Sequence, residues 1–274
     1  MAKDSIPPAL IIAMGVSGSG KSTLGQNLAS ALGVPFYDGD SLHPKSNVDK
    51  MSKGIPLTDA DREPWLALIR RTADRICEKK EADPSSADEI KGVVIACSAL
   101  KRYYRDILRG RTTKSHQPPP ATDLPKDHPI TEHTGIEIQS DQESAKEEEK
   151  ELERAASREL RTFFVFINGP RDILVDRMTK RQNHFMKVEM LDSQLATLED
   201  PTGEEGVVVV QLAESPDKQI RDAVDGLKKL GFPDQRSELP SDGVSSNIPP
   251  PVDEPARLLR PTAQEANPVD PLSS

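Results

Sequence analysis

The chain has 274 residues and a net charge of −9, and only 35% of its residues are hydrophobic. Such an acidic chain lacks the basic surface that nonspecific nucleic-acid binding requires, and no run approaches the roughly 20 apolar residues of a membrane span. The first residues do not resemble a signal peptide, and Cys77 and Cys97 form no CxxC pair. We therefore expect a cytoplasmic protein that binds neither nucleic acid nor membranes.

The first predicted elements are a strand, a glycine-rich loop and a helix. An apolar run at residues 9–14 precedes Gly-Val-Ser-Gly-Ser-Gly-Lys-Ser at 15–22, and residues 23–32 have helical spacing. The loop fits the spacing G-x-x-x-x-G-K-[ST] of phosphate-binding loops, whose N–H groups, lysine and helix dipole attract phosphate. A Gly/Ser linker with a chance lysine is the alternative, but it does not explain the flanking strand and helix. The residues expected to bind nucleotide are Gly15, Val16, Ser17, Gly18, Ser19, Gly20, Lys21, Ser22 and Thr23.

Two carboxylates follow the second predicted strand, at residues 34–38. Asp38 and Asp40 flank Gly39, close to where the phosphates of a nucleotide would lie. One carboxylate can hold Mg²⁺ through water, together with the hydroxyl of Ser22, and the other can orient or deprotonate an acceptor hydroxyl. The alternative is a surface turn, since Asp-Gly is a common turn dipeptide. The residues alone do not assign the two roles.

Further along the chain, apolar runs alternate with segments of helical spacing. A helix is predicted at 62–80, with Thr58 as its N-cap. The later elements are a strand at 92–97, a strand at 162–167, a helix from Arg171, a helix at 188–198, a strand at 206–212 and a helix at 217–230. Five strand runs separated by helices predict an α/β fold with a five-stranded parallel sheet between two helical layers. Ligands of such sheets bind at the carboxyl ends of the strands.

The composition divides the chain into four parts. Residues 1–110 are predicted to form a phosphate-loop core, and residues 160–231 to complete that core. Between them, residues 111–159 are acidic and rich in proline, and residues 232–274 are rich in Pro, Ser and Asp. Neither segment has enough apolar residues to bury a core, so both are predicted to be disordered.

Several motifs, in order, resemble those of the gluconokinases, small phosphate-loop kinases that use ATP to phosphorylate D-gluconate on O6. After the phosphate loop come D-G-D-S-L-H-P-K-S-N-V-D-K-M at 38–51 and G-I-P-L-T-D-A-D-R-E-P-W-L at 54–66. C-S-A-L-K-R-Y-Y-R-D at 97–106 and R-M-T-K-R-Q-N-H-F at 177–185 continue the pattern. The resemblance covers about residues 8–110 and 162–230. The insertion and the tail are not part of the compact family pattern.

The resemblance implies a nucleoside-monophosphate-kinase-like fold with substrate-binding helices and a lid. It also implies ATP and Mg²⁺ as cofactors, and 6-phospho-D-gluconate for the pentose phosphate pathway as the product. By analogy Ser22 and Asp38 bind the metal, Asp40 serves the acceptor hydroxyl, and the lid arginines stabilise charge on the transferred phosphoryl group. The implied catalytic residues are Lys21, Asp40, Arg177 and Arg181. The implied substrate-binding residues are Asp40, His43, Lys50, Arg62, Ser98, Lys101, Arg105 and His184.

Purely structural or solvent-exposed roles are alternatives to several of these assignments. The planar guanidinium of Arg62 suits a carboxylate, but a salt bridge to Asp59 or Asp61 fits the sequence equally well. Arg177 and Arg181 lie four residues apart, which also fits an exposed cationic end of a helix.

Two other functions remain open from the sequence. One is a shikimate- or nucleoside-monophosphate-like kinase, and the other is a nucleotide-binding scaffold without catalysis. The sequence does not decide the oligomeric state, and a homodimer is possible. It also leaves open whether the insertion and the tail bind unknown partners.

Overall fold

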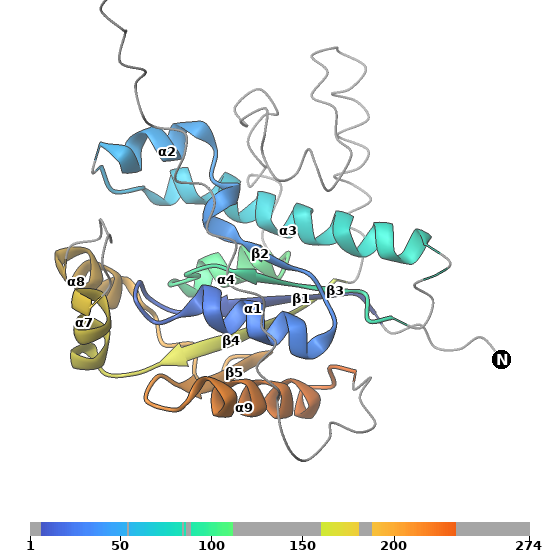
Figure 1. Cartoon of the computed structure of the whole chain (residues 1–274). Coiled ribbons are helices and arrows are strands. Elements are labelled where there is room, and N and C mark those ends of the chain that lie inside the picture. Colours follow the sequence, from blue (N-terminus) through green and yellow to red (C-terminus); the bar gives the residue numbers. More distant parts are fainter. Residues whose placement is uncertain are drawn as a thin grey trace, which may run out of the picture. The chain divides into compact units, whose positions relative to one another are not determined.

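The computed structural model describes residues 7–53, 55–83, 85, 89–111, 160–180 and 188–233. Its centre is a five-stranded sheet in the order β2-β3-β1-β4-β5, in which every neighbouring pair is parallel (Figure 1). The strands are β1 (Ala9–Met14), β2 (Phe36–Asp38), β3 (Gly92–Ala96), β4 (Arg161–Asn168) and β5 (Val207–Gln211). The predicted α/β fold with a five-stranded parallel sheet is confirmed.

Some sequence predictions lie outside the described residues. These are the insertion after residue 111, the tail after residue 233, and the two site residues Arg181 and His184. No helix in the described part of the chain is both long and apolar enough to cross a membrane.

Helices cover both faces of the sheet and gather at one of its ends. Figure 1 shows α3 and α4 on one face, α1 and α9 on the other, and α2, α7 and α8 toward the end where β1 leads into the glycine-rich loop. The helices are α1 (Lys21–Leu32), α2 (Lys45–Ser52), α3 (Asp59–Ala82), α4 (Arg102–Leu108), α7 (Arg171–Lys180), α8 (Val188–Thr197) and α9 (Pro216–Lys229), with a 3₁₀ turn at Gly39–Leu42. Helix α2 is short and mostly polar, so the apolar spacing of the sequence did not predict it.

The central strand β1 contributes to two separate cores. Ala9, Ile11 and Ala13 pack into the core beneath α1 and α9, whereas Leu10 and Ile12 pack into the core beneath α3 and α4. Every residue of β1 is buried. A parallel sheet covered on both faces needs apolar side chains on both faces, which explains the continuous apolar runs of the sequence.

The long helix α3 begins with a reciprocal cap. Thr58 accepts a hydrogen bond from the N–H of Asp61, and the carboxylate of Asp61 accepts one from the N–H of Thr58. This capping box satisfies two N–H groups that a helix start otherwise leaves unpaired. The predicted N-cap is confirmed, and the helix starts three residues earlier than the apolar spacing indicated.

We expect Gly226→Ala to destabilise the fold even though alanine is the better helix former. A Cβ atom at Gly226 would lie 2.4 Å from Cγ1 of Val208, so α9 would have to move away from β5. Such overpacking costs about 1–3 kcal/mol in free energy of unfolding. Asp225→Ala, at the exposed neighbouring position of the same helix, is the control. Urea denaturation measures both variants, and equal stabilities would contradict this packing.

Candidate active site

Three strands deliver the candidate residues to one edge of the sheet. Ala13, near the end of β1, pairs with Ala96 at the end of β3, and Asp38 at the end of β2 pairs with the same Ala96. The glycine-rich loop, the Asp38 carboxylate and Ser98 therefore leave the sheet at the same level. This register brings together residues that are up to about 80 positions apart in the sequence, as expected for the ligand-binding edge of a parallel sheet.

The glycine-rich loop forms a cradle for an anion. Gly18 and Gly20 adopt φ values of 78° and 95°, which L side chains rarely adopt, and α1 begins directly after Gly20 with no side-chain cap. Its first N–H groups therefore point toward the loop without a side-chain acceptor. The buried Oγ of Ser19 has no hydrogen-bond partner among the described residues, and Nζ of Lys21 donates to the carbonyl oxygen of Val16 over 3.1 Å. These donors and this charge fit a phosphate group.

Ser22 and Asp38 meet beside this cradle. Oγ of Ser22 donates to Oδ2 of Asp38 over 2.9 Å, and Oδ1 of Asp38 accepts the N–H of Asp40 over 3.0 Å. A hydroxyl and a carboxylate are the hard oxygen donors that Mg²⁺ prefers. The residues present at this position therefore fit a magnesium ion next to bound phosphates.

Asp40 has a carboxyl group that holds its proton more tightly than an ordinary aspartate. Its side chain is 81% exposed, so water reaches it, but protein atoms crowd the surrounding space. This desolvation raises the pKa of Asp40, the negative charge of Asp38 raises it further, and the ammonium of Lys21 opposes both. The raised pKa makes the carboxylate a better proton acceptor.

His43 is buried beside Asp40 in its neutral form. Its ring stacks on Trp65 with 4.0 Å between centroids, and Nδ1 lies 3.3 Å from Nδ2 of Asn47. Burial and the nearby positive charge of Arg62 lower the pKa of His43 to about 4. Nε2 lies 4.0 Å from Oδ1 of Asp40. A neutral imidazole in this place can exchange a hydrogen bond with a substrate hydroxyl.

Two residues outside the predicted site hold this corner in place. The indole Nε1 of Trp65 donates to the carbonyl oxygen of Gly39 over 2.8 Å, and Nδ2 of Asn47 donates to that of Asp61 over 2.9 Å. The sequence showed Trp65 only as an apolar position of a helix. Its spacing gave no sign that the ring would fix the turn between the two carboxylates, because that contact joins residues 26 positions apart.

The cationic residues that were predicted to bind the substrate differ in their partners within the protein. Lys50 pairs with Asp61 at 2.5 Å, and Lys101 pairs with Asp59 at 2.7 Å. The hydrogen bond from Lys50 lowers the pKa of Asp61 to about 2. Arg62 forms no ion pair within 4 Å of any carboxylate of the described residues, although its positive charge adds to the hydrogen bond from Lys101 in lowering the pKa of Asp59. Its positive charge also acts on His43.

Arg105 does not fit the role that the sequence analysis gave it. Its side chain is fully buried, and its guanidinium makes a bidentate pair with Glu204 at 2.5 and 3.0 Å. The remaining N–H groups donate to the carbonyl oxygens of Ala99, Leu100 and Glu199. We therefore remove Arg105 from the candidate substrate site. Its partner lies 99 positions further along the chain, so the sequence pattern could not reveal the pairing.

A cavity of about 390 Å³ lies beside the glycine-rich loop, next to helices α1, α7 and α9. It is lined by Gly18 of the loop, Thr23 and Asn27 of α1, Arg177 of α7 and Gln219 of α9. Because it adjoins the anion cradle, it is placed to take the rest of a nucleotide. Asn27 and Gln219 are new members of the site, since no motif in the sequence marked them.

Helices α7 and α8 both contact the glycine-rich loop. The guanidinium of Arg177 donates to the carbonyl oxygens of Leu212 over 2.8 Å and Ser19 over 3.4 Å. The side-chain oxygen of Gln194, in α8, accepts the N–H of Ser17 over 2.7 Å. Arg177 therefore lies beside the loop, while its action on a transferred phosphoryl group stays a prediction. The contact of Gln194 with the loop was not apparent from the sequence pattern.

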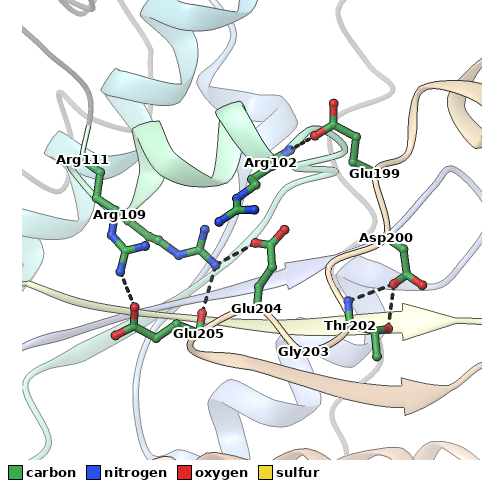
Figure 2. A pocket seen from close by; sticks show the side chains of 9 residues that line it. All are labelled: Arg102, Arg109, Arg111, Glu199, Asp200, Thr202, Gly203, Glu204 and Glu205. Carbon is green, nitrogen blue, oxygen red and sulfur yellow. Dashed lines mark hydrogen bonds and ion pairs between the residues drawn. The ribbon is translucent and has the colours of Figure 1, made fainter.

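A second cavity, of about 480 Å³, lies between α4 and the loop at 199–205 (Figure 2). Arg109 pairs with Glu204, Arg111 pairs with Glu205, and the backbone N–H of Arg102 donates to the carboxylate of Glu199. Its carboxylates and arginines thus largely engage one another or the backbone. We do not include this cavity in the candidate active site.

The sequence of this chain is similar to those of known kinases. A family profile described as shikimate kinase matches residues 17–111. The gluconokinase of Gluconobacter oxydans is 37% identical over 219 residues, which cover 80% of this chain and 91% of that protein. The chain belongs to the gluconokinase family. A probable gluconokinase of Mus musculus is 39% identical over 211 residues, covering 76% of this chain and 91% of that protein.

A solved structure supports membership of the gluconokinase family. The gluconokinase crystal structure from Sinorhizobium meliloti 1021 is 38% identical in sequence, with a TM-score of 0.53. The match covers 82% of this chain and 93% of that one. The family resemblance drawn from the motifs is therefore confirmed.

We expect His43 to make the fold less stable in acid. The unfolded chain binds a proton at His43 near pH 6.5, whereas the folded protein does so only near pH 4. The contribution of neutral His43 to the free energy of unfolding is therefore complete above pH 6.5. It is lost as the pH falls toward 4, and the loss is on the order of 3 kcal/mol. Denaturation between pH 7 and 4 should show a shallower pH dependence for His43→Gln than for the unchanged protein. Parallel curves would mean that His43 titrates normally.

Proposed function

We propose that this member of the gluconokinase family transfers the γ-phosphoryl group of Mg²⁺-ATP to O6 of D-gluconate. The proposal rests on one observation: the groups that fit phosphate and Mg²⁺ lie directly next to the groups proposed to bind the acceptor. Ser22 and Asp38 are in contact beside the anion cradle, Asp40 contacts Asp38 on one side, and its carboxylate lies 4.0 Å from the ring of His43 on the other. Phosphoryl transfer needs donor and acceptor in line at such a junction.

On the nucleotide side, the proposal uses the glycine-rich loop and its flanks. Lys21 and the N–H groups of the loop would bind the phosphates, and Ser22 and Asp38 would hold Mg²⁺, directly or through water. When bound, Mg²⁺ neutralises charge on the transferred group. Arg177 lines the cavity beside the loop, which supports contact with the nucleotide.

On the acceptor side, the chemistry of gluconate matches the available groups. The guanidinium of Arg62 suits the carboxylate of gluconate, since it is not engaged by a described carboxylate. Neutral His43 would take a hydroxyl, and Asp40 would orient the reacting hydroxyl and accept its proton. Ser98 remains a proposed contact of gluconate. Lys50 and Lys101 would also bind gluconate, either after releasing their carboxylate partners or while still paired with them.

Other parts of the proposal rest on the sequence alone. Arg181 and His184, outside the described residues, would complete the site from the lid. The proposal also places the enzyme in the cytoplasm, which is supported by Cys77 and Cys97 being outside any disulfide of the described residues. A homodimer remains a prediction.

The direct test is an ADP-release assay with Mg²⁺-ATP and a panel of acceptors. We expect turnover with D-gluconate and little with shikimate, AMP or neutral sugars, because these lack either the carboxylate or the flexible chain of hydroxyls. Purified, folded protein that acts on shikimate or AMP but not on gluconate would refute the proposal. Binding of ATP with no turnover on any acceptor would favour the scaffold alternative.

The two carboxylates should respond differently to removal of charge. Asp40→Asn keeps the shape of the side chain but loses its basicity, so we expect kcat to fall about 10²-fold or more with little change in KM for ATP. Asp38→Asn, the matched variant two residues away, should instead raise the Mg²⁺ concentration needed for half-maximal rate. Steady-state kinetics across a Mg²⁺ series distinguish these outcomes, and the reverse pattern would exchange the two roles.

A further inference from the structure

One residue beside the acceptor site has an unusual backbone conformation. Ala99 has a φ of 45°, and it is the only residue other than glycine with positive φ in the described part of the chain. Its side chain is buried, so the segment has little room to relax. It lies directly after Ser98 and two residues before Lys101. A strained conformation of this kind persists only where surrounding contacts enforce it.

Arg105 binds the backbone of this segment. Nη1 of Arg105 donates to the carbonyl oxygen of Ala99 over 2.9 Å and to that of Leu100 over 3.0 Å. Nε and Nη2 bind both carboxylate oxygens of Glu204, and Nη2 also reaches the carbonyl oxygen of Glu199. The planar guanidinium thus donates hydrogen bonds both to the backbone of residues 99–100 and to one carboxylate.

The carboxylate partner is itself fixed by a second arginine. Glu204 also accepts from Arg109 over 3.0 Å, as Figure 2 shows. In the same loop, the N–H of Glu199 donates to the carbonyl oxygen of Leu100 over 2.9 Å, and the Glu199 carboxylate accepts from the N–H of Arg102. The loop at 199–205 is therefore bound to the segment at 97–102 by backbone and charged contacts alike.

We propose that Arg105, anchored by Glu204, is a positioning residue that holds residues 97–101 in the strained conformation that presents Ser98 and Lys101 to the acceptor. Arg105 does not touch the substrate in this role and acts through the carbonyl groups of Ala99 and Leu100. The kinetic part of the inference rests on the proposed function. The conformational part, that Arg105 orders residues 97–101, does not depend on it.

The test compares Arg105→Lys with Arg109→Lys in the full chain. Lysine keeps the charge beside Glu204, but a single ammonium cannot span the carboxylate and both carbonyl groups. Arg109 pairs with the same carboxylate and has no contact with the carbonyl groups of residues 99 and 100, so it is the matched control. For Arg105→Lys we expect KM for gluconate to rise about tenfold or more, as misplaced binding groups do, with less than about a twofold change in KM for ATP. Arg109→Lys should change neither constant beyond about twofold.

Hydrogen exchange measured without substrates gives a readout that does not require turnover. Peptides covering residues 97–101 should exchange faster in Arg105→Lys than in Arg109→Lys, while peptides of the glycine-rich loop stay unchanged. If the unchanged protein shows no activity on gluconate but this exchange pattern appears, the proposed function fails and the positioning role stands. Equal exchange in the two variants would overturn the positioning role, whatever the kinetics.

A second substitution tests the strain itself. Glycine adopts positive φ without the penalty that alanine has, so Ala99→Gly added to Arg105→Lys should restore at least part of the lost affinity for gluconate. A double variant that binds gluconate no better than Arg105→Lys would contradict the mechanism. If Arg105→Lys does not fold, Glu204→Gln replaces it, since it leaves Arg105 in place and removes the charge that anchors it. The same split between the two KM values and the same exchange pattern are then expected, and their absence would refute the proposal.

Discussion

The burial of both faces of the parallel sheet is the constraint on which the rest of this structure depends. Because β1 sends alternate side chains into two apolar cores, it has no face on which a polar group could be solvated. Polar chemistry is therefore confined to the loops that leave the strands, and the register of β1, β2 and β3 brings three of these loops to one edge. The register brings the glycine-rich loop, Asp38 and Ser98 close together, and the hydrogen bond from Ser22 to Asp38 then joins two of them.

The electrostatics of the site follow from how its charges are shared with the scaffold. Lys50 and Lys101 bind carboxylates at the start of α3, and Arg105 binds Glu204, so these cations stabilise the walls of the site. Arg62 makes no ion pair with a carboxylate of the described residues, and its charge adds to the burial that lowers the pKa of His43. A chain with an overall charge of −9 can thus offer a local positive group to an anionic acceptor.

The contrast between Arg62 and Arg105 shows where reasoning from motifs succeeds and where it stops. Both arginines lie in segments typical of the family, and both were expected to meet the substrate. Arg62 donates to the carbonyl oxygen of Leu57 and its charge acts on His43, whereas Arg105 is buried and holds two backbone carbonyl groups. Only the position of Glu204, which comes from a distant loop, separates the two cases. A buried arginine needs such a partner, because an unpaired buried charge is strongly destabilising.

The sequence by itself determined the local features of this protein. Apolar runs defined the five strands, Thr58 marked the start of α3, and the spacing of Gly15 to Ser22 specified the phosphate loop, because each depends on residues adjacent in the chain. The tertiary structure alone decided which cations pair with carboxylates of the scaffold, which groups line the cavity beside the loop, and how burial lowers the pKa of His43. These properties depend on contacts between distant residues, and burial and pairing arise only when the chain packs.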